Sequence, residues 1–267
     1  MEQKFSLKVS SLKQSVQQME SQFEDTLILN PVENIPFPDI LAPSVSFMHG
    51  LYNTDTYRSQ TEKYSSKIQF SGREQVTEDI QNIYSMWADL LGAETVSMRL
   101  LSGLHAHIVL FMGLTEIGDK VLFLPEKAGG HTSGRDILER LGLVLEEIPY
   151  DCANHRIDRE QCLAKIETFK PDIIFVDRSE GLIYEDLTWL GNSNYGYKIF
   201  DASQYLTNII CKDHCNPFDM GFDLMLSTLH KNLPGPQRAL VCSKNDDSRR
   251  RRLRSKISTY VSNMHFY

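Results

Sequence analysis

Five short segments of the sequence hold the side chains that are best suited to chemistry. In chain order they are Ser102-Gly103-Leu104, Gly129-Gly130-His131, Asp201, His230-Lys231 and Gly235-Pro236-Gln237. Each has an ordinary explanation when it is taken alone, because Ser commonly caps helices, Asp often closes turns, and most His and Lys side chains are solvated. The chemistry therefore depends on whether the fold brings these segments together.

Taken as a set, the segments fit the parts of a phosphorylated pyridine ring. Ser102 and Gly103 would open a helix, whose free N–H groups and partial positive charge suit a phosphate. The imidazole of His131, on its Gly-rich loop, could stack on a flat ring or donate a hydrogen bond. Asp201 opposite a pyridine nitrogen would keep that nitrogen protonated, which makes the ring an electron sink. Lys231 could form a Schiff base with a ring aldehyde, so the set indicates pyridoxal 5'-phosphate (PLP).

From about residue 74 onward, short apolar runs alternate with amphipathic stretches. The predicted strands are Val96–Leu100, Lys120–Leu124, Val144–Ile148, Asp172–Val176, Lys198–Phe200, Leu224–Ser227 and Ala239–Cys242. The predicted helices occupy residues 74–91, 103–115, 132–142 and 158–169. This alternation predicts an α/β domain with a mainly parallel seven-stranded sheet that is covered on both faces. Ligands bind beyond the carboxyl ends of such strands, and the first four candidate segments follow those ends.

The first 73 residues lack this regular pattern. Residues 5–25 predict a helix with one narrow apolar stripe, which would pack against another surface such as a second subunit. Residues 30–73 hold turn-forming residues and few periodic runs, and they predict a long irregular segment of the kind found at interfaces or functional sites. We therefore divide the chain into an N-terminal helix and irregular dimer or active-site arm, residues 1–73, and a PLP-binding large domain, residues 74–267.

The composition excludes several classes of protein. The formal net charge is -7 over 267 residues, and this acid excess argues against nucleic-acid and membrane partners. No apolar run approaches the roughly 18 residues of a membrane span, and the N-terminus has no apolar signal core. The five cysteines are an odd number, and Cys211, His214 and Cys215 lack a second ligand pair at zinc spacing. We therefore predict no disulfide framework, no metal and a cytoplasmic location.

The motifs together resemble serine hydroxymethyltransferase and its relatives. The resemblance runs from about Leu27 to about Cys242. It includes Glu33-Asn34-Ile35-Pro36, Phe200-Asp201 and, as the most specific motif, His230-Lys231-Asn232-Leu233-Pro234-Gly235-Pro236. It implies a three-layer large domain of the aspartate-aminotransferase-like fold, known as fold type I, and PLP as the cofactor.

The resemblance also implies a role for each matching residue. Lys231 would bind PLP, Asp201 would pair with the ring nitrogen, and His131 would stack on the ring. The remaining cofactor contacts would come from the helix start, from the wall beside the lysine and from the residue three after the Asp: Ser102, Gly103, Leu104, Thr228, His230 and Gln204.

Three positions depart from the family pattern. The family has a Glu in its Tyr-rich loop that handles protons at the substrate hydroxyl, and the nearest match here is Asp55. Gln204 replaces a family His, and an uncharged amide cannot give the same proton chemistry. Gln237 stands where the folate-using enzymes have an Arg. Pro-Gly-Pro-Gln more closely resembles the threonine transaldolase-like branch, whose members make β-hydroxy amino acids in natural-product pathways.

The resemblance therefore implies a PLP-dependent transferase or lyase with aldol-type chemistry between an aldehyde and a glycine-, serine- or threonine-like amino acid. Its candidate catalytic residues are Lys231, His131, His230 and Asp55. Family members are longer and carry a C-terminal small domain that clamps the substrate carboxylate. With that domain absent, a separate polypeptide would complete a split enzyme. The fold also implies a homodimer or a larger assembly. Two alternatives stay open: a non-catalytic scaffold or regulatory subunit, and another PLP reaction such as transamination.

Overall fold

The computed structural model describes residues 2–30, 32–50, 52–53, 70–71, 73–179, 184–245, 247–249, 251–253 and 264–265. Its centre is a seven-stranded sheet of order β2-β10-β9-β8-β7-β3-β4. The strands are β2 (Thr95–Leu100), β3 (Lys120–Phe123), β4 (Val144–Glu147), β7 (Ile173–Asp177), β8 (Tyr197–Asp201), β9 (Leu224–Thr228) and β10 (Ala239–Ser243). All seven predicted strands are present, with each end within one residue of its predicted position.

Strand direction places the carboxyl ends of six strands at one edge of the sheet. The pairs β3–β4, β3–β7, β7–β8 and β8–β9 are parallel. Strand β10 is antiparallel to both of its neighbours, β9 and β2, so β2 and β9 point the same way. The mainly parallel sheet is thus confirmed, and its edge is where ligands of such folds bind.

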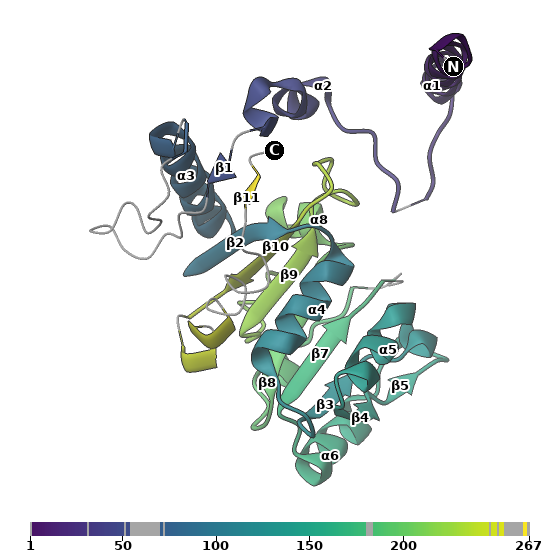
Figure 1. Cartoon of the computed structure of the whole chain (residues 1–267). Coiled ribbons are helices and arrows are strands. Elements are labelled where there is room, and N and C mark those ends of the chain that lie inside the picture. Colours follow the sequence, from purple (N-terminus) through teal and green to yellow (C-terminus); the bar gives the residue numbers. More distant parts are fainter. Residues whose placement is uncertain are drawn as a thin grey trace.

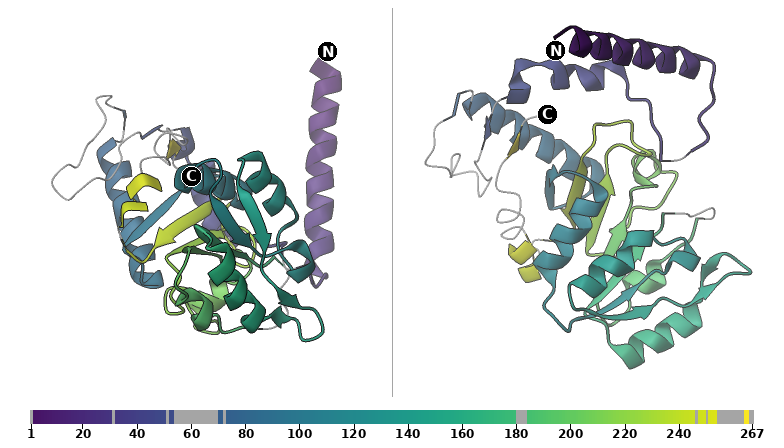
Figure 2. Two further views of the ribbon diagram at one scale, coloured as in Figure 1. Left: turned by 90° about the horizontal axis from the view of Figure 1, so that it is seen from below. Right: turned by 45° about the vertical axis from the view of Figure 1, so that its right-hand side comes forward.

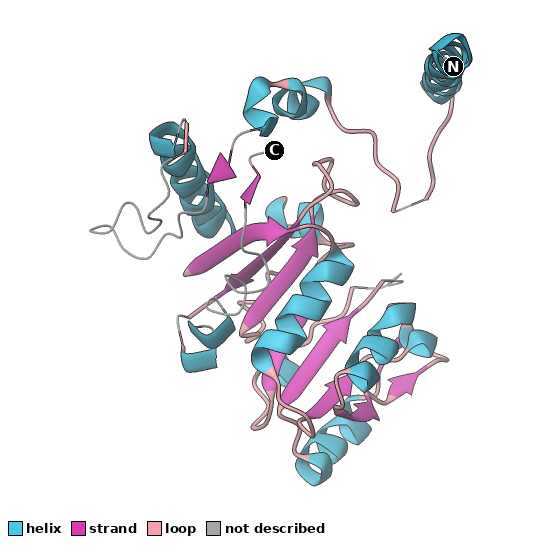
Figure 3. Ribbon diagram, viewed as in Figure 1, coloured by secondary structure: helices cyan, strands magenta, loops and turns pink. Residues whose placement is uncertain are grey.

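Helices cover the sheet because alternate strand residues face opposite sides. Leu122 and Ile174 belong to one apolar core cluster, whereas their neighbours Phe123 and Phe175 belong to another. The covering helices are α3 (Arg73–Leu91), α4 (Gly103–Leu114), α5 (Thr132–Arg140) and α6 (Arg159–Phe169). Figures 1 and 3 show the strands as one layer with helices packed around it. These four helices match the predicted ones to within two residues at each end.

Several short elements were not predicted. They are the 3-10 helix η3 (Glu126–Ala128), α7 (Thr188–Gly191), α8 (Leu206–Ile210) and the two-stranded hairpin of β5 (Tyr150–Asp151) and β6 (Arg156–Ile157). Each is too short to show a period in the sequence. Within the described ranges, no helix has the length and apolar character needed to cross a bilayer.

The N-terminal helix α1 (Glu2–Glu24) confirms the predicted helix and stands apart from the sheet (Figure 1 and the right view of Figure 2). The segment after it is less irregular than predicted. It holds α2 (Pro38–Leu41), η1 (Ala42–Val45), η2 (Phe47–Gly50) and β1 (Tyr52–Asn53), which pairs with β11 (Met264–His265). Pro38 and Pro43 lie in the first turns of α2 and η1, where proline's fixed backbone angle favours a helix. The boundary between residues 73 and 74 stays a prediction.

Candidate active site

The predicted site residues meet in one pocket at the carboxyl edge of the sheet. Every predicted site residue that the structure describes lines it: Ser102, Gly103, Leu104, His131, Asp201, Gln204, Thr228, His230 and Lys231. The remaining one, Asp55, lies outside the described residues. The residues come together because their segments leave neighbouring strands at the same edge.

The start of α4 forms one wall of the pocket. Ser102 is its N-cap, with an extended backbone and an Oγ that accepts a hydrogen bond from the N–H of His105 at 3.2 Å. A Cβ added to Gly103 would lie 2.8 Å from Cγ2 of Thr228, so the helix start packs closely against the end of β9. The first-turn N–H groups of α4 are therefore presented beside Thr228, in a position that suits an anion.

His131 is held by the loop that follows β3. Its Nδ1 accepts hydrogen bonds from the N–H of Ser133 at 3.2 Å and from the Ser133 hydroxyl at 2.7 Å. Burial lowers the pKa of His131, so the ring is neutral at pH 7. Because Nδ1 is an acceptor, Nε2 carries the proton and is the atom that can donate to a ligand.

Asp201 ends β8 and is fixed by two donors. Its Oδ1 accepts from the N–H of Ser203 at 2.8 Å, and its Oδ2 lies 2.7 Å from Nε2 of His107. Burial acts to raise the pKa of Asp201, but the hydrogen bond and charge of His107 together with the hydrogen bonds from Ser203 outweigh it, and the net shift is downward. Asp201 is therefore an ionised carboxylate that faces the pocket at neutral pH.

Lys231 connects the pocket to the N-terminal arm. The side-chain amide of Asn34 donates a hydrogen bond to the backbone carbonyl of Lys231, across 197 positions of sequence. Lys231 also lines a second hollow, together with Asn30, Glu33 and Asn232. The Glu33-Asn34 motif noted in the sequence thus lies beside the candidate lysine.

Several buried polar atoms in the pocket lack a hydrogen-bond partner within the described part of the chain. They are both polar side-chain atoms of Gln204, Oγ1 of Thr228, Nε of Arg178, Oδ2 of Asp177 and Nδ1 of His107. Buried polar groups are nearly always paired in folded proteins, so this number in one pocket points to a polar ligand. The unpaired atoms of Gln204, Thr228 and Arg178 could meet polar groups of such a ligand.

Sequence reasoning missed five residues that also line the pocket: His107, Asp177, Arg178, Ser179 and Ser203. Two of them left a signal in the sequence. His107 is a polar residue among the buried positions of the mostly apolar α4, and a buried polar group needs a partner. Asp177 closes an apolar strand as Asp201 does, and the two are register partners in β7 and β8.

Comparisons with known proteins find similar sequences along most of the chain. Residues 10–262 match the family model described as serine hydroxymethyltransferase. Over 249 residues the chain is 28% identical to a serine hydroxymethyltransferase of Sulfolobus acidocaldarius, covering 91% of this chain and 55% of that protein. It is 27% identical to the corresponding protein of Pyrobaculum calidifontis over 68% of this chain and 44% of that one. The chain thus spans about half the length of these curated relatives.

A solved structure extends the agreement at the level of the fold. The crystal structure of L-threonine transaldolase from Pseudomonas fluorescens superposes with a TM-score of 0.86 at 19% sequence identity. The match covers 99% of this chain and 60% of that one. At this identity the likeness shows a shared fold, and it includes the arm as well as the sheet.

Proposed function

Because the chain belongs to the serine hydroxymethyltransferase family, we propose that it binds PLP through Lys231 and serves an aldol-type reaction of a small amino acid. The observation that supports this most is the meeting of Lys231, Asp201 and His131 in one pocket with the start of α4. Each of these groups is common, but their convergence on one pocket matches the parts of this cofactor.

The pocket residues fit the cofactor part by part. The N-terminus of α4 with Ser102 and Gly103 would hold the phosphate. The hydroxyl of Thr228 has no hydrogen-bond partner among the described residues and could donate to the same group. Asp201 would face the ring nitrogen, and the buried amide of Gln204 could meet a polar ring substituent. When bound, PLP would supply an aldehyde to the amine of Lys231 and an electron sink for charge at the substrate Cα.

The remaining chemistry belongs to the histidines. His131 has a neutral ring with its proton on Nε2, so it could orient a ligand by donating a hydrogen bond. Nδ1 of His230 lies 3.3 Å from the carbonyl oxygen of Arg238, which places the proton on Nδ1 and leaves Nε2 as a base. Burial lowers the pKa of His230, so this base is unprotonated at neutral pH.

We propose an amino acid of the glycine, serine or threonine class and an aldehyde as the reactants. The names of the relatives, serine hydroxymethyltransferase and L-threonine transaldolase, support this class. We also propose that groups outside the region matched here complete the substrate site, since the relatives contain residues beyond that region. The alternatives are a non-catalytic subunit with the same fold and a different PLP reaction.

Covalent trapping tests whether PLP forms a Schiff base with the side-chain amine of Lys231. The full chain is incubated with PLP, reduced with borohydride, digested and analysed by mass spectrometry. We expect the pyridoxyl group on Lys231 and no label on that segment in Lys231→Ala. Lys127→Ala is the matched control, because Lys127 is an exposed lysine paired with Glu147 on the surface, and it should label as the wild type does.

Two results would contradict the proposal. Folded chain that gives no pyridoxyl label at saturating PLP would remove the cofactor assignment, and equal labelling of Lys231→Ala at another lysine would remove the residue assignment. Labelled protein whose absorbance does not respond to glycine, serine or threonine, with the remaining region of the relatives supplied, would favour the non-catalytic subunit.

A further inference from the structure

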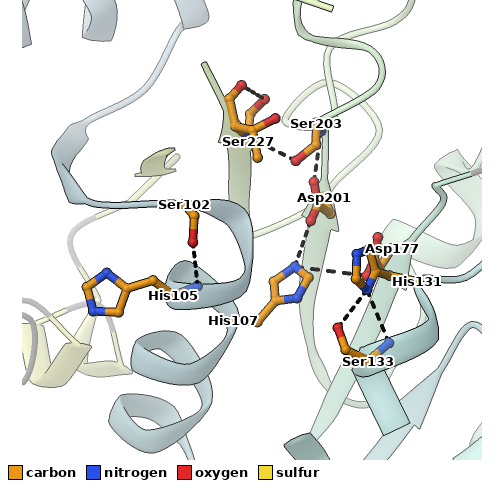
Figure 4. A network of polar contacts seen from close by, with 10 residues as sticks. Ser102, His105, His107, His131, Ser133, Asp177, Asp201, Ser203 and Ser227 are labelled. Carbon is orange, nitrogen blue, oxygen red and sulfur yellow. Dashed lines mark hydrogen bonds and ion pairs between the residues drawn. The ribbon is translucent and has the colours of Figure 1, made fainter. Parts of the chain in front are cut away.

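A second buried carboxylate lies behind Asp201, and one imidazole joins the two. Nε2 of His107 is 2.7 Å from Oδ2 of Asp201 and 3.9 Å from Oδ2 of Asp177. The three side chains are 4–7% exposed, and Figure 4 shows the imidazole between the two carboxylates. An imidazole and two carboxylates in so small a volume cannot take up and release protons independently, since two isolated charges of one sign are costly there.

Three elements fix this geometry. His107 lies on the buried side of α4, while Asp177 and Asp201 are register partners at the ends of β7 and β8. The ring of Phe175 packs edge-on against the His107 ring at 5.3 Å between centroids. The imidazole is therefore held from below by an apolar ring and from the side by two acids, and it has little freedom to turn away.

A proton network explains this cluster better than a metal ion does. His107, Asp177 and Asp201 are of the residue types that bind metals. However, two atoms bound to one zinc ion at about 2.0–2.1 Å in tetrahedral geometry lie about 3.3 Å apart. The 2.7 Å between His107 and Asp201 is instead the length of a charge-assisted hydrogen bond.

We propose that His107 and Asp177 are positioning residues that set the charge of Asp201, with His107 holding the carboxylate ionised and Asp177 taking up the proton that two adjacent acids cannot both release. This inference deepens the proposed function, because it rests on Asp201 facing the ring nitrogen of PLP. His107 and Asp177 would touch neither cofactor nor substrate in this role.

The electrostatics of the three groups agree with this division. The pKa of Asp177 is raised to about 7, first by burial and then by the charge of Asp201. Burial would lower the pKa of His107, but the hydrogen bond to Asp201 and the charge of Asp177 raise it overall. The other charged or titratable groups that act on His107 and Asp177 are Lys231 and, on His107, His131. Near pH 7 the network therefore holds Asp201 ionised and Asp177 partly protonated, and it favours the protonated form of His107.

The two residues should act on Asp201 differently, and a purely structural role would weaken PLP binding at every pH instead of moving a midpoint. Without His107, Asp201 loses a hydrogen-bond donor and takes up a proton at higher pH, so the acidic midpoint of PLP affinity should rise. Asp177 already carries a proton at the pH where Asp201 gains one, because its pKa is about 7 and that of Asp201 is lowered, so Asp177→Asn should leave the acidic midpoint in place. His107→Asn keeps a donor without a charge and should lie between the wild type and His107→Leu.

The experiment measures PLP affinity against pH by fluorescence quenching for the full chain and for His107→Leu, His107→Asn and Asp177→Asn. We expect roughly 10- to 100-fold weaker binding at pH 7 for His107→Leu. Its acidic midpoint should rise by roughly 1–3 units, and that of Asp177→Asn should stay at the wild-type value. His155→Asn, at an exposed histidine in the β5–β6 turn, should leave the profile unchanged. An acidic midpoint that does not rise in His107→Leu, or that rises equally in Asp177→Asn, would overturn the inference.

A second measurement decides the inference without the cofactor. Nitrogen-15 spectra of the histidine rings in the PLP-free chain follow the protonation of His107, which His107→Asn assigns. We expect an imidazole that stays protonated above its ordinary pKa and loses its proton earlier in Asp177→Asn. An ordinary pKa for His107 in both proteins would overturn the network. Lack of PLP binding by the wild type would instead contradict the proposed function alone.

Discussion

The Asp177 carboxylate makes the stability of the cofactor-free chain depend on pH. Its pKa is about 7 in the folded protein, against 3.8 for the free side chain. Between these values the folded state binds more protons than the unfolded state, so stability falls as pH rises from about 4 to 7. A shift of this size corresponds to about 4 kcal/mol by pH 7. The contribution of His107 to stability also falls as pH rises, but in a higher pH range. Its pKa is raised in the folded protein, so this contribution is lost only above about pH 6.5.

We therefore expect Asp177→Asn to remove the decline in stability between about pH 4 and 6.5, below the range in which His107 titrates. The free energy of unfolding, from urea titrations at several pH values, measures this slope. Asp136→Asn changes an exposed carboxylate on α5 and should leave the slope unchanged. A mutant whose stability still falls across this range would show that Asp177 is ionised in the folded chain.

At the level of single residues, the sequence predicted the groups that meet a ligand better than the groups that support them. Asp201 ends the apolar strand β8 and Lys231 lies three residues after the end of β9, so the strand pattern places them at the binding edge. The role of His107 depends on which face of α4 meets the sheet and on the order of β7 and β8 within it. Neither is visible in a single sequence, and so the pair of His107 and Asp177 could not be assembled before the fold.

At the level of elements, Gly130 sets the path of the loop that carries His131. A Cβ at this position would lie 2.2 Å from the carbonyl oxygen of Leu124 and 2.9 Å from that of Pro125, both of them backbone atoms that cannot swing away. The N–H of Gly130 also donates to the carbonyl of Pro125 at 3.0 Å, so the turn has no room to open. The close approach, rather than the backbone angle, requires glycine here.

Gly130→Ala should therefore destabilise the chain by about 1–3 kcal/mol, as overpacking does, and should weaken PLP binding by moving His131. Gly134→Ala is the matched control four residues away, inside α5, where an added Cβ meets nothing within 4 Å. That change should stabilise the helix by about 0.5–1 kcal/mol. Thermal unfolding of the two variants separates these cases, and equal effects would show that the loop can adjust.

The elements themselves were largely predictable, and the exceptions share a cause. Strands β7, β9 and β10 are buried at every position, which gives continuous apolar runs that are easy to find. Helices α7 and α8 have four and five residues, and they lie in the connections between strands. Their stability comes from packing around them rather than from a local pattern.

At the level of the whole molecule, α1 presents an apolar surface that nothing in the described chain covers. Its large apolar residues are spaced alternately three and four apart, and they are 37–65% exposed: Val9, Leu12, Val16, Met19 and Phe23. This spacing forms one seam along a helix, of the kind that packs against another protein surface. The arm that follows α1 contacts the backbone of Lys231 through Asn34, so this arm links the helix to the candidate active site.

We propose that a second copy of the chain covers this seam, and that the seam can be tested apart from the fold. Leu12→Asp with Met19→Asp places two charges on the seam, and Gln14→Asp with Ser21→Asp places the same two charges, seven residues apart, on the opposite face. Burying one Leu or Met contributes about 1.5–3 kcal/mol, so the seam variant should weaken self-association roughly 100-fold or more. The control should associate as the wild type does.

Both variants should unfold at the same temperature as monomers, because α1 side chains from residue 8 to 24 are exposed in the single chain. Sedimentation equilibrium across a concentration series measures the association, and equal constants for the two variants would mean that the seam faces solvent or a different protein.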